Sequence, residues 1–208
     1  MQNKLKAGIA IAALALLTPM AQAAAFSNGG FEASSYSGPF TTVNTNGTLG
    51  AWTVVSGSVD LINTYWAPSE GHYSLDLNGG QAGSIQQLFD TVIGKTYTVT
   101  FDLAGNPAGG GTTKYMFAGI GTDANMYTFS TVGKSQANMG WITNSFSFVA
   151  DSTSTLLSFS GFAGNGAYGA ALDNVRVTTP VPEPETYGML LAGLGLVGLV
   201  ARRKKQAK

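Results

Sequence analysis

Residues 26–179 are expected to form an all-β domain, because three features of the sequence agree. Of the 208 residues, 44% are hydrophobic and only 11% are charged, with 28 glycines; about 25% charged residues would be ordinary. Polar and apolar residues alternate along much of the segment, which is the period of a half-buried strand. Apolar residues do not keep helical spacing for three turns anywhere in it. We therefore expect a jelly-roll β-sandwich of about ten short strands.

The expected strands are separated by segments with the composition of turns. The clearest strand is 96–103, in which polar and apolar residues alternate without a break. Alternation shifts its phase at 85–89 and at 172–177, and each shift predicts a β-bulge. Asn- and Gly-rich turns are expected at 44–47, 78–80, 105–111 and 164–166, and further short strands at 73–77, 115–120, 144–148, 156–162 and 174–177.

The first 25 residues have the three parts of a secretory signal peptide. Lys4 and Lys6 precede an apolar run over 7–20, and small residues follow it. Cleavage is expected after Ala23 or Ala25. A buried helix is the alternative, but it would need polar residues along one face, and the run has none.

The last 29 residues predict a spacer and a membrane segment. Three prolines in 180–185 prevent regular helix or sheet. Residues 186–201 are almost entirely apolar and would span roughly 24 Å as a helix, slightly less than a ~30 Å hydrocarbon core. The basic residues of 202–205 can cover the difference by snorkelling, and they are expected to stay cytoplasmic.

This arrangement resembles a known sorting signal. Pro182-Glu183-Pro184, an apolar segment and then Arg202-Arg203 at the terminus are similar to the PEP-CTERM signal of Gram-negative bacteria. The resemblance implies an exosortase, a membrane transpeptidase-like enzyme, as a partner in species that make extracellular polysaccharide. A plain tail anchor is the alternative, and it would leave the Pro-Glu-Pro sequence unexplained.

The body also resembles a family. The motifs that carry the resemblance lie in order along the segment 28–175, from Asn28-Gly29-Gly30-Phe31-Glu32 to Ala171-Leu172-Asp173-Asn174-Val175. They are similar to the "choice-of-anchor C" proteins, which are related to the plant cell-wall DUF642 domains. The resemblance implies a galactose-binding-like jelly roll whose biochemical role is largely unassigned. Further matching motifs are 57–62, Trp66, 71–79, 97–101, Trp141 and 146–148.

Charge and composition exclude several classes of function. Between Phe26 and Thr179 there are four Lys and Arg against nine Asp and Glu, a net charge of −5, which argues against nucleic-acid binding. The chain has no cysteine, so thiolate metal sites and a cysteine nucleophile are excluded. A single histidine, His72, excludes a histidine-based metal cluster and gives no triad signal.

Glu32 and Asp173 are the expected metal ligands. Jelly rolls that open with Gly-Phe-Glu and close with Asp-Asn-Val often bring this Glu and Asp together on adjacent strands. Carboxylate oxygens suit Ca²⁺, which takes 6–8 oxygen ligands. The sequence therefore predicts a structural Ca²⁺ site, with hydrogen bonding of both acids to the backbone at strand ends as the alternative.

A loop that contains two adjacent aromatic residues is the expected sugar-binding site. Tyr65 and Trp66 lie between strands, where large rings usually have a packing or binding role. Core packing of Trp66 is the alternative. Asn63, Glu70 and His72 lie nearby in sequence and would contact the sugar hydroxyls, whereas Trp52, Tyr127 and Trp141 are expected in the core.

The expected function is that of a secreted, non-enzymatic β-sandwich protein associated with extracellular polysaccharide, in a matrix or adhesion role. The alternative is a hydrolase of extracellular glycans. That reaction would need two carboxylates about 5–10 Å apart. The pair would come from Glu32, Glu70, Asp76 and Asp102.

Overall fold

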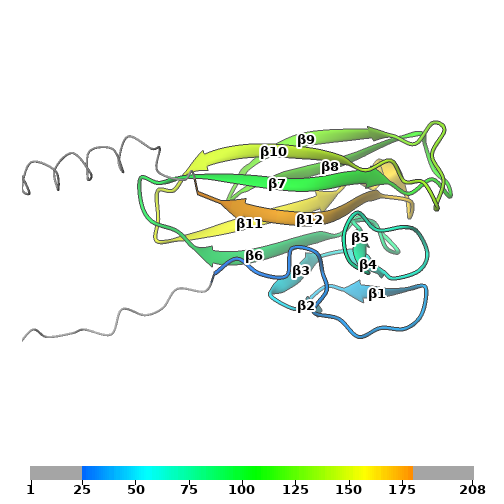
Figure 1. The fold of residues 1–208 in the computed structure, drawn as a ribbon, viewed down its shortest axis with the longest axis horizontal. Helices are drawn as coiled ribbons and strands as arrows, with labels where there is room; N and C mark the ends of the chain where they lie inside the picture. Colours follow the sequence, from blue (N-terminus) through cyan, green and yellow to red (C-terminus); the bar gives the residue numbers. More distant parts are fainter. Residues whose placement is uncertain (1–24, 180–208) are drawn as a thin grey trace, which may run out of the picture.

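Two antiparallel sheets packed face to face form the domain, which a computed structural model describes over residues 25–179. The described residues contain no helix longer than the three-residue 3₁₀ helix η1 (Ala163–Asn165). This confirms the expected all-β sandwich (Figure 1). In spatial order the first sheet contains β1 (Phe40–Asn44), β4 (Ser58–Ile62), β5 (Ser74–Asp76), β12 (Ala170–Thr178), β7 (Thr96–Gly105) and β10 (Ile142–Val149). The second contains β2 (Thr48–Leu49), β3 (Trp52–Ser56), β6 (Ser84–Asp90), β11 (Ser154–Gly161), β8 (Thr113–Ile120) and β9 (Asp123–Ser130).

Aromatic side chains fill the space between the two sheets. Trp52 is fully buried, and its ring centroid lies 5.9 Å from that of Phe159. Phe101 packs against Phe159 at 5.2 Å and against the half-buried Tyr127 at 5.0 Å. These edge-to-face contacts join β3, β7, β9 and β11, so residues far apart in sequence fix how the sheets pack.

One of the two expected bulges is present. The register between β12 and β7 shifts between Asp173 and Arg176, and Asn174 has a positive φ of 50°. Asp173 lies just before the shift, paired with Asp102 on the outer face of the first sheet, and the shift returns Val175 to the interior.

The bulge expected at 85–89 was wrong. β6 pairs with β11 without a shift from Ser84 to Asp90, and the shift in its pairing with β3 adds the extra residue, Val55, to β3. Gln87 points inward and is 2% exposed, because its side-chain amide exchanges two 2.9 Å hydrogen bonds with the backbone of Ser27. Leu88 points outward and is 60% exposed. The polar pair therefore reflects a buried amide in a regular strand.

Residues 63–73 form a loop that covers part of the outer face of the first sheet. The Trp66 indole donates a 2.8 Å hydrogen bond to Ser74 Oγ on β5. Ala67 bonds through its backbone to Gln136 and accepts a hydrogen bond from the Trp141 indole. Trp141 is thus half-buried against this loop.

Predictions for the two ends of the chain fall outside the described residues. These are the signal peptide, of which only Ala25 is described, the sorting motif from 180 onward and the membrane segment 186–201. Within residues 25–179, no helix is long and apolar enough to cross a membrane.

Candidate functional site

A cavity of about 370 Å³ opens on the outer face of the first sheet, beside the loop 63–73. Strands β1, β4 and β5 form its floor, and loops near Asn106 and Tyr168 form the opposite wall. We call it the ring-lined pocket. Its lining residues are Phe40, Thr42, Asp60, Ile62, Tyr65, Asp76, Gly79, Gly80, Asn106, Ala167 and Tyr168.

Two carboxylates lie side by side on the floor of this pocket. Asp60 on β4 is paired directly with Asp76 on β5, and the alternation of both strands turns these side chains outward. Directly opposed residues have Cβ atoms about 4.5–5.5 Å apart. Thr42 Oγ1 donates a 2.6 Å hydrogen bond to Asp60 Oδ1, and Asn106 Nδ2 donates a 2.9 Å hydrogen bond to Asp76 Oδ2.

Burial keeps this pair from ionising fully at neutral pH. Burial is the largest cause that raises the pKa of Asp76, to about 7, and the neighbouring Asp60 carboxylate adds to it. Hydrogen bonds from Asn106 and from the backbone of Asn78 and Gly169 oppose the rise in pKa. Burial also raises the pKa of Asp60, against the hydrogen bond from Thr42. The floor therefore holds both carboxylate and carboxylic acid near pH 7, which can accept and donate hydrogen bonds.

Three aromatic rings surround the acidic floor. Phe40 and Tyr65 pack edge to face with centroids 5.5 Å apart, on the side of β1 and the loop 63–73. Tyr168 lies in the loop that precedes β12 and is 39% exposed, while Phe40 is 41% exposed. Exposed ring faces beside hydrogen-bonding groups are the two elements that a sugar ring requires, since a sugar has apolar C–H faces and polar edges.

A buried lysine supports the Tyr168 wall. Lys114 on β8 is 1% exposed, and its ammonium donates a 2.6 Å hydrogen bond to the carbonyl of Gly109. The same ammonium lies 6.0 Å from the centre of the Tyr168 ring. A Cβ at Gly109 would stand 2.7 Å from that ring, so only glycine allows this approach.

The five residues expected to form the sugar site separate in the structure. Tyr65 lines the ring-lined pocket. Trp66 is 3% exposed and belongs to the core, so the prediction that its ring faces a sugar is corrected. Asn63 uses its side-chain amide to bind the backbone of Tyr36 and Gly38. Glu70 pairs with Arg176 at 3.1 Å, and His72 is exposed; neither lines the pocket.

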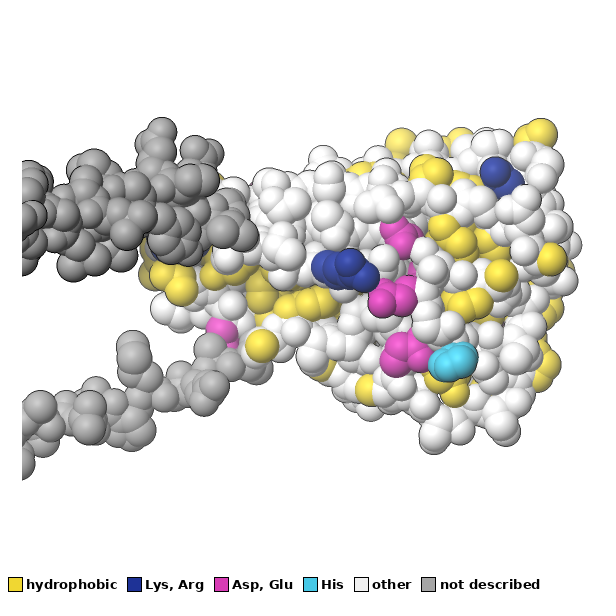
Figure 2. All heavy atoms as spheres, viewed as in Figure 1, with side chains coloured by type: hydrophobic (Ala, Val, Ile, Leu, Met, Phe, Trp, Pro, Cys, Tyr) yellow, Lys and Arg dark blue, Asp and Glu magenta, His cyan; other side chains and the backbone are white. Residues whose placement is uncertain are grey.

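Glu32 and Asp173 hold the segment 69–73 from opposite sides. Glu32 Oε1 accepts hydrogen bonds from the backbone N–H groups of His72 and Tyr73 at 2.8 and 2.9 Å. Asp173 Oδ2 accepts those of Ser69 and Glu70 at 2.8 and 3.0 Å. On the face shown in Figure 2, acidic side chains gather in the middle of the domain beside a basic one.

A further acidic residue, Asp102 on β7, is paired with Asp173 on β12. Burial opposes its ionisation, but hydrogen bonds from Ser69, Thr143 and Asn174 outweigh that effect and lower its pKa. Burial raises the pKa of Asp173 to about 7 against three backbone hydrogen bonds. The sheet register thus places Asp102 beside Asp173, and Asp76 beside Asp60.

The oxygen donors at Glu32 and Asp173 match the chemistry of Ca²⁺. A Cβ at Gly30 would lie 3.7 Å from Glu32 Cγ and 4.0 Å from Asp173 Oδ1, so both side chains lie near Gly30. The side-chain oxygen of Asn174, next in sequence to Asp173, is buried without a hydrogen-bond partner. Among the described residues no three His, Asp or Glu side chains form a metal-binding group, so backbone or water oxygens would complete the shell.

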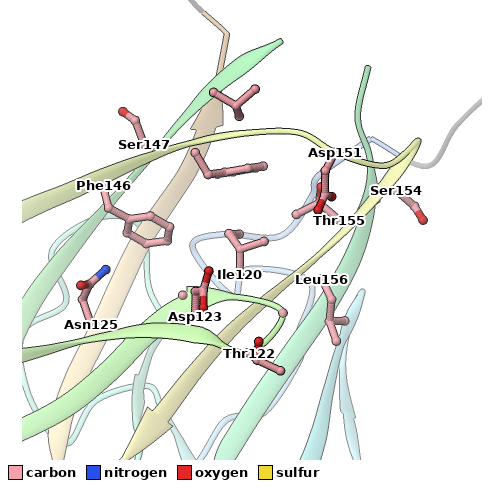
Figure 3. A pocket seen from close by; sticks show the side chains of 14 residues that line it. Ile120, Thr122, Asp123, Asn125, Phe146, Ser147, Asp151, Ser154, Thr155 and Leu156 are labelled. Atoms are coloured by element: carbon pink, nitrogen blue, oxygen red, sulfur yellow. The ribbon is translucent and has the colours of Figure 1, made fainter. Parts of the chain in front are cut away.

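A second cavity, of about 450 Å³, lies between the edge strands of the two sheets (Figure 3). Phe146 and Ile120 point toward each other across it, with Asp123 below (Figure 3). Phe148 also lines it, but the ring stacks on Tyr97 in the interior at 5.5 Å. Because its rings take part in packing between the sheets, we regard the ring-lined pocket as the stronger binding site.

Sequence reasoning missed most of the ring-lined pocket. Asp60 was not among the candidate residues, and neither were Phe40, Asn106 and Tyr168. One signal was available: Asp60 and Asp76 are each flanked by apolar residues in consecutive strands. A carboxylate at the outward position of two paired strands indicates a shared polar site, but the pairing itself depends on register.

Comparisons with known proteins match the two parts of the chain separately. A family model described as "Protein of unknown function (DUF642)" matches residues 24–178, and a "PEP-CTERM protein-sorting motif" matches residues 180–205. Halomucin of Haloquadratum walsbyi (strain DSM 16790 / HBSQ001) is 35% identical over 160 residues, which are 72% of this chain and 2% of that protein. The chain thus spans only a small fraction of that relative's length.

Solved structures include an enzyme and a carbohydrate-binding module. Arabinose-bound MgGH51 α-L-arabinofuranosidase has a TM-score of 0.50 and 15% identity, covering 77% of this chain and 27% of that one. TmCBM61 in complex with β-1,4-galactotriose has a TM-score of 0.43 and 16% identity, covering 74% of this chain and 97% of that one. The first of these likenesses concerns the fold alone.

Proposed function

The chain belongs to the DUF642 family, and we propose that its domain binds an extracellular polysaccharide in the ring-lined pocket without cleaving it. The observation that carries the proposal is the arrangement of Phe40, Tyr65 and Tyr168 around the Asp60–Asp76 pair. Exposed rings can stack on the C–H faces of sugars, and the half-buried Asp60 can exchange hydrogen bonds with sugar hydroxyls. A cavity of about 370 Å³ has the size of a small-ligand pocket, so it would take a short stretch of the polymer.

The state of Asp76 favours binding over hydrolysis. A general acid must reach the glycosidic oxygen, but Asp76 is 1% exposed. Its two carboxylate oxygens already accept hydrogen bonds from Asn78, Gly169 and Asn106. Asp76 is therefore held as part of the floor, and Asp60 is the carboxylate within reach of a ligand.

The sorting motif supports a place of action at the envelope or cell surface. Residues 180–205 indicate secretion and sorting to the envelope or cell surface, and they imply processing by an exosortase. A domain that binds polysaccharide in that location would act as a matrix or adhesion component. This role is part of the proposal.

Affinity electrophoresis in gels that contain the producing organism's extracellular polysaccharide tests the proposal. Tyr168→Ala should abolish the retardation that the wild-type domain shows. Phe162→Ala is the matched control, because Phe162 is 40% exposed and does not line the pocket. Equal retardation of both variants would exclude this pocket, and release of reducing ends during incubation would favour the hydrolase alternative.

A further inference from the structure

Exposed apolar side chains gather at the end of the sandwich where the described chain stops. Val92 and Ile93, in the turn between β6 and β7, are each 60% exposed. Val149, the last residue of β10, is 63% exposed. We call these three residues the apolar tip. Figure 2 shows exposed hydrophobic side chains at this left-hand end of the domain.

Hydrogen bonds unite the two turns that carry the tip. Gly94 N–H donates to the Ala150 carbonyl at 2.7 Å, and Ala150 N–H donates to the Lys95 carbonyl at 2.9 Å. Val149 is paired with Thr96 at the start of β7. The three residues of the tip therefore lie close together at this end of the domain.

The described chain ends beside this surface. Thr178 at the end of β12 is paired with Thr98, two residues from the start of β7 (Figure 1). At about 3.3 Å per residue, that separation is roughly 7 Å along the strand. The seven residues 180–186 can extend at most about 25 Å before the apolar run 187–200 begins. Any membrane that holds this run is within reach of the tip.

We propose that the apolar tip rests on the lipid surface of the membrane that holds the C-terminal segment. Val and Ile side chains gain free energy by leaving water for the apolar part of the interface. A short tether raises their effective concentration at that surface, so a weak contact is enough to orient the domain.

The charges around the tip favour an apolar contact over an electrostatic one. Lys95 and Asp151 are exposed beside it, and Asp90 is half-buried at the end of β6. One base among two acids gives no attraction to anionic lipids. The contact should therefore persist at high salt.

The tip contact orients the glycan-binding surface. The ring-lined pocket includes Tyr168 and Asn106, which lie beyond the far end of β7, whereas the tip lies at its beginning. A domain that stands on its tip would hold the pocket away from the bilayer. The proposal does not depend on the pocket, because the tip and the tail alone define it.

Site-specific labelling of the full chain tests the contact, because the chain has no cysteine of its own. An environment-sensitive NBD label is placed at Ile93→Cys or Val149→Cys, and the protein is reconstituted into phosphatidylcholine–phosphatidylglycerol vesicles. Both labels should shift to shorter emission wavelength and be quenched by nitroxide-labelled lipids. Val132→Cys is the control, because Val132 is 69% exposed in the turn after β9, at the opposite end of the sandwich.

Flotation with the vesicles reports separately whether the tail is inserted. A protein that floats while its label at residue 93 stays as water-exposed as that at 132 overturns the proposal. If the label at residue 93 is already shielded from water before lipid is added, the tail or a second copy of the protein covers the tip. That result also overturns the proposal. An Ile93→Asp protein should still float but lose the quenching at a label on residue 149.

Discussion

Asp60 and Asp76 occupy directly opposed positions on β4 and β5, so two acidic side chains share the floor of the ring-lined pocket. Asp76 is buried and Asp60 is half-buried, and burial raises the pKa of both. The pair is thus costly in its fully ionised form. Asp76 is needed by the fold, because it accepts hydrogen bonds from the backbone of Asn78 and Gly169 and from Asn106. Among the described residues, Asp60 accepts a hydrogen bond only from the exposed hydroxyl of Thr42, which leaves it available for a binding role.

The acidic pair should make stability depend on pH. The pKa of Asp76 is about 7 in the folded domain, above the unfolded value near 3.8. Between these values the folded state keeps a proton that the unfolded state has lost, so stability falls as pH rises from 4 to 7. Asp76→Asn has no such proton. The unfolding free energy of the variant minus that of the wild type should therefore rise by roughly 2–4 kcal/mol between pH 4 and pH 8.

Urea denaturation at a series of pH values measures this effect. Comparing the two proteins at each pH reports the titration of the coupled Asp60–Asp76 pair, because Asp173 and all other ionisable groups are present in both. A difference that stays constant from pH 4 to pH 8 would contradict the raised pKa. If glycan binds in the ring-lined pocket, the glycan affinity of the wild type should also change between pH 4 and pH 8. The affinity of Asp76→Asn should stay constant over that range.

The fold could be predicted because period-two alternation is a local property. Residues 96–103 became β7, and the phase break near Asp173 became a bulge, since each depends on the order of neighbouring residues. The error at 85–89 has the opposite origin. Gln87 is buried because Ser27, sixty residues earlier, satisfies its amide, and sequence gives no sign of that partner.

The candidate site could be predicted only in part, for the same reason. Tyr65 belongs to the pocket, but the sequence could not tell it from Trp66, which points to Ser74 and the core. Asp60 acquires its partner from the register of β4 against β5. Side chains that meet across strands and loops are set by tertiary packing, which local pattern does not contain.

Calcium binding between Glu32 and Asp173 remains a proposal with a direct thermal test. A ligand that binds only the folded state at a hundredfold excess over Kd adds about 2.7 kcal/mol. Removal by EGTA should therefore lower the Tm of a domain of this size by roughly 5–10 °C. Asp173→Asn should abolish that response, while Glu70→Gln, which alters only the exposed ion pair with Arg176, should retain it. Identical melting curves with and without EGTA would leave backbone hydrogen bonding as the whole role of both acids.

Processing at the Pro-Glu-Pro sequence should be visible in the mass of the mature protein. If residues 182–184 are a sorting signal, envelope-derived protein lacks the first 23–25 residues and the basic tail. Intact-mass spectrometry distinguishes this form from a plain anchor. A species that still ends at Lys208 in exosortase-competent cells would refute processing, and a Pro182→Ala, Pro184→Ala double variant provides the uncleaved reference.

The neighbours Tyr65 and Trp66 should give opposite results when each is replaced by alanine. Trp66 is 3% exposed and hydrogen-bonded to Ser74, so Trp66→Ala should cost ~3–5 kcal/mol of unfolding free energy through the cavity that it leaves. Tyr65 is half-buried on the pocket wall, so Tyr65→Ala should cost much less stability. It should nevertheless weaken polysaccharide binding at least tenfold, because one of the three rings is lost. Denaturation and affinity electrophoresis on the same two proteins separate the effects. The opposite result would be a Tyr65→Ala protein with full affinity for the polysaccharide and a folded Trp66→Ala protein that has lost it. The binding surface would then lie on the other side of the loop.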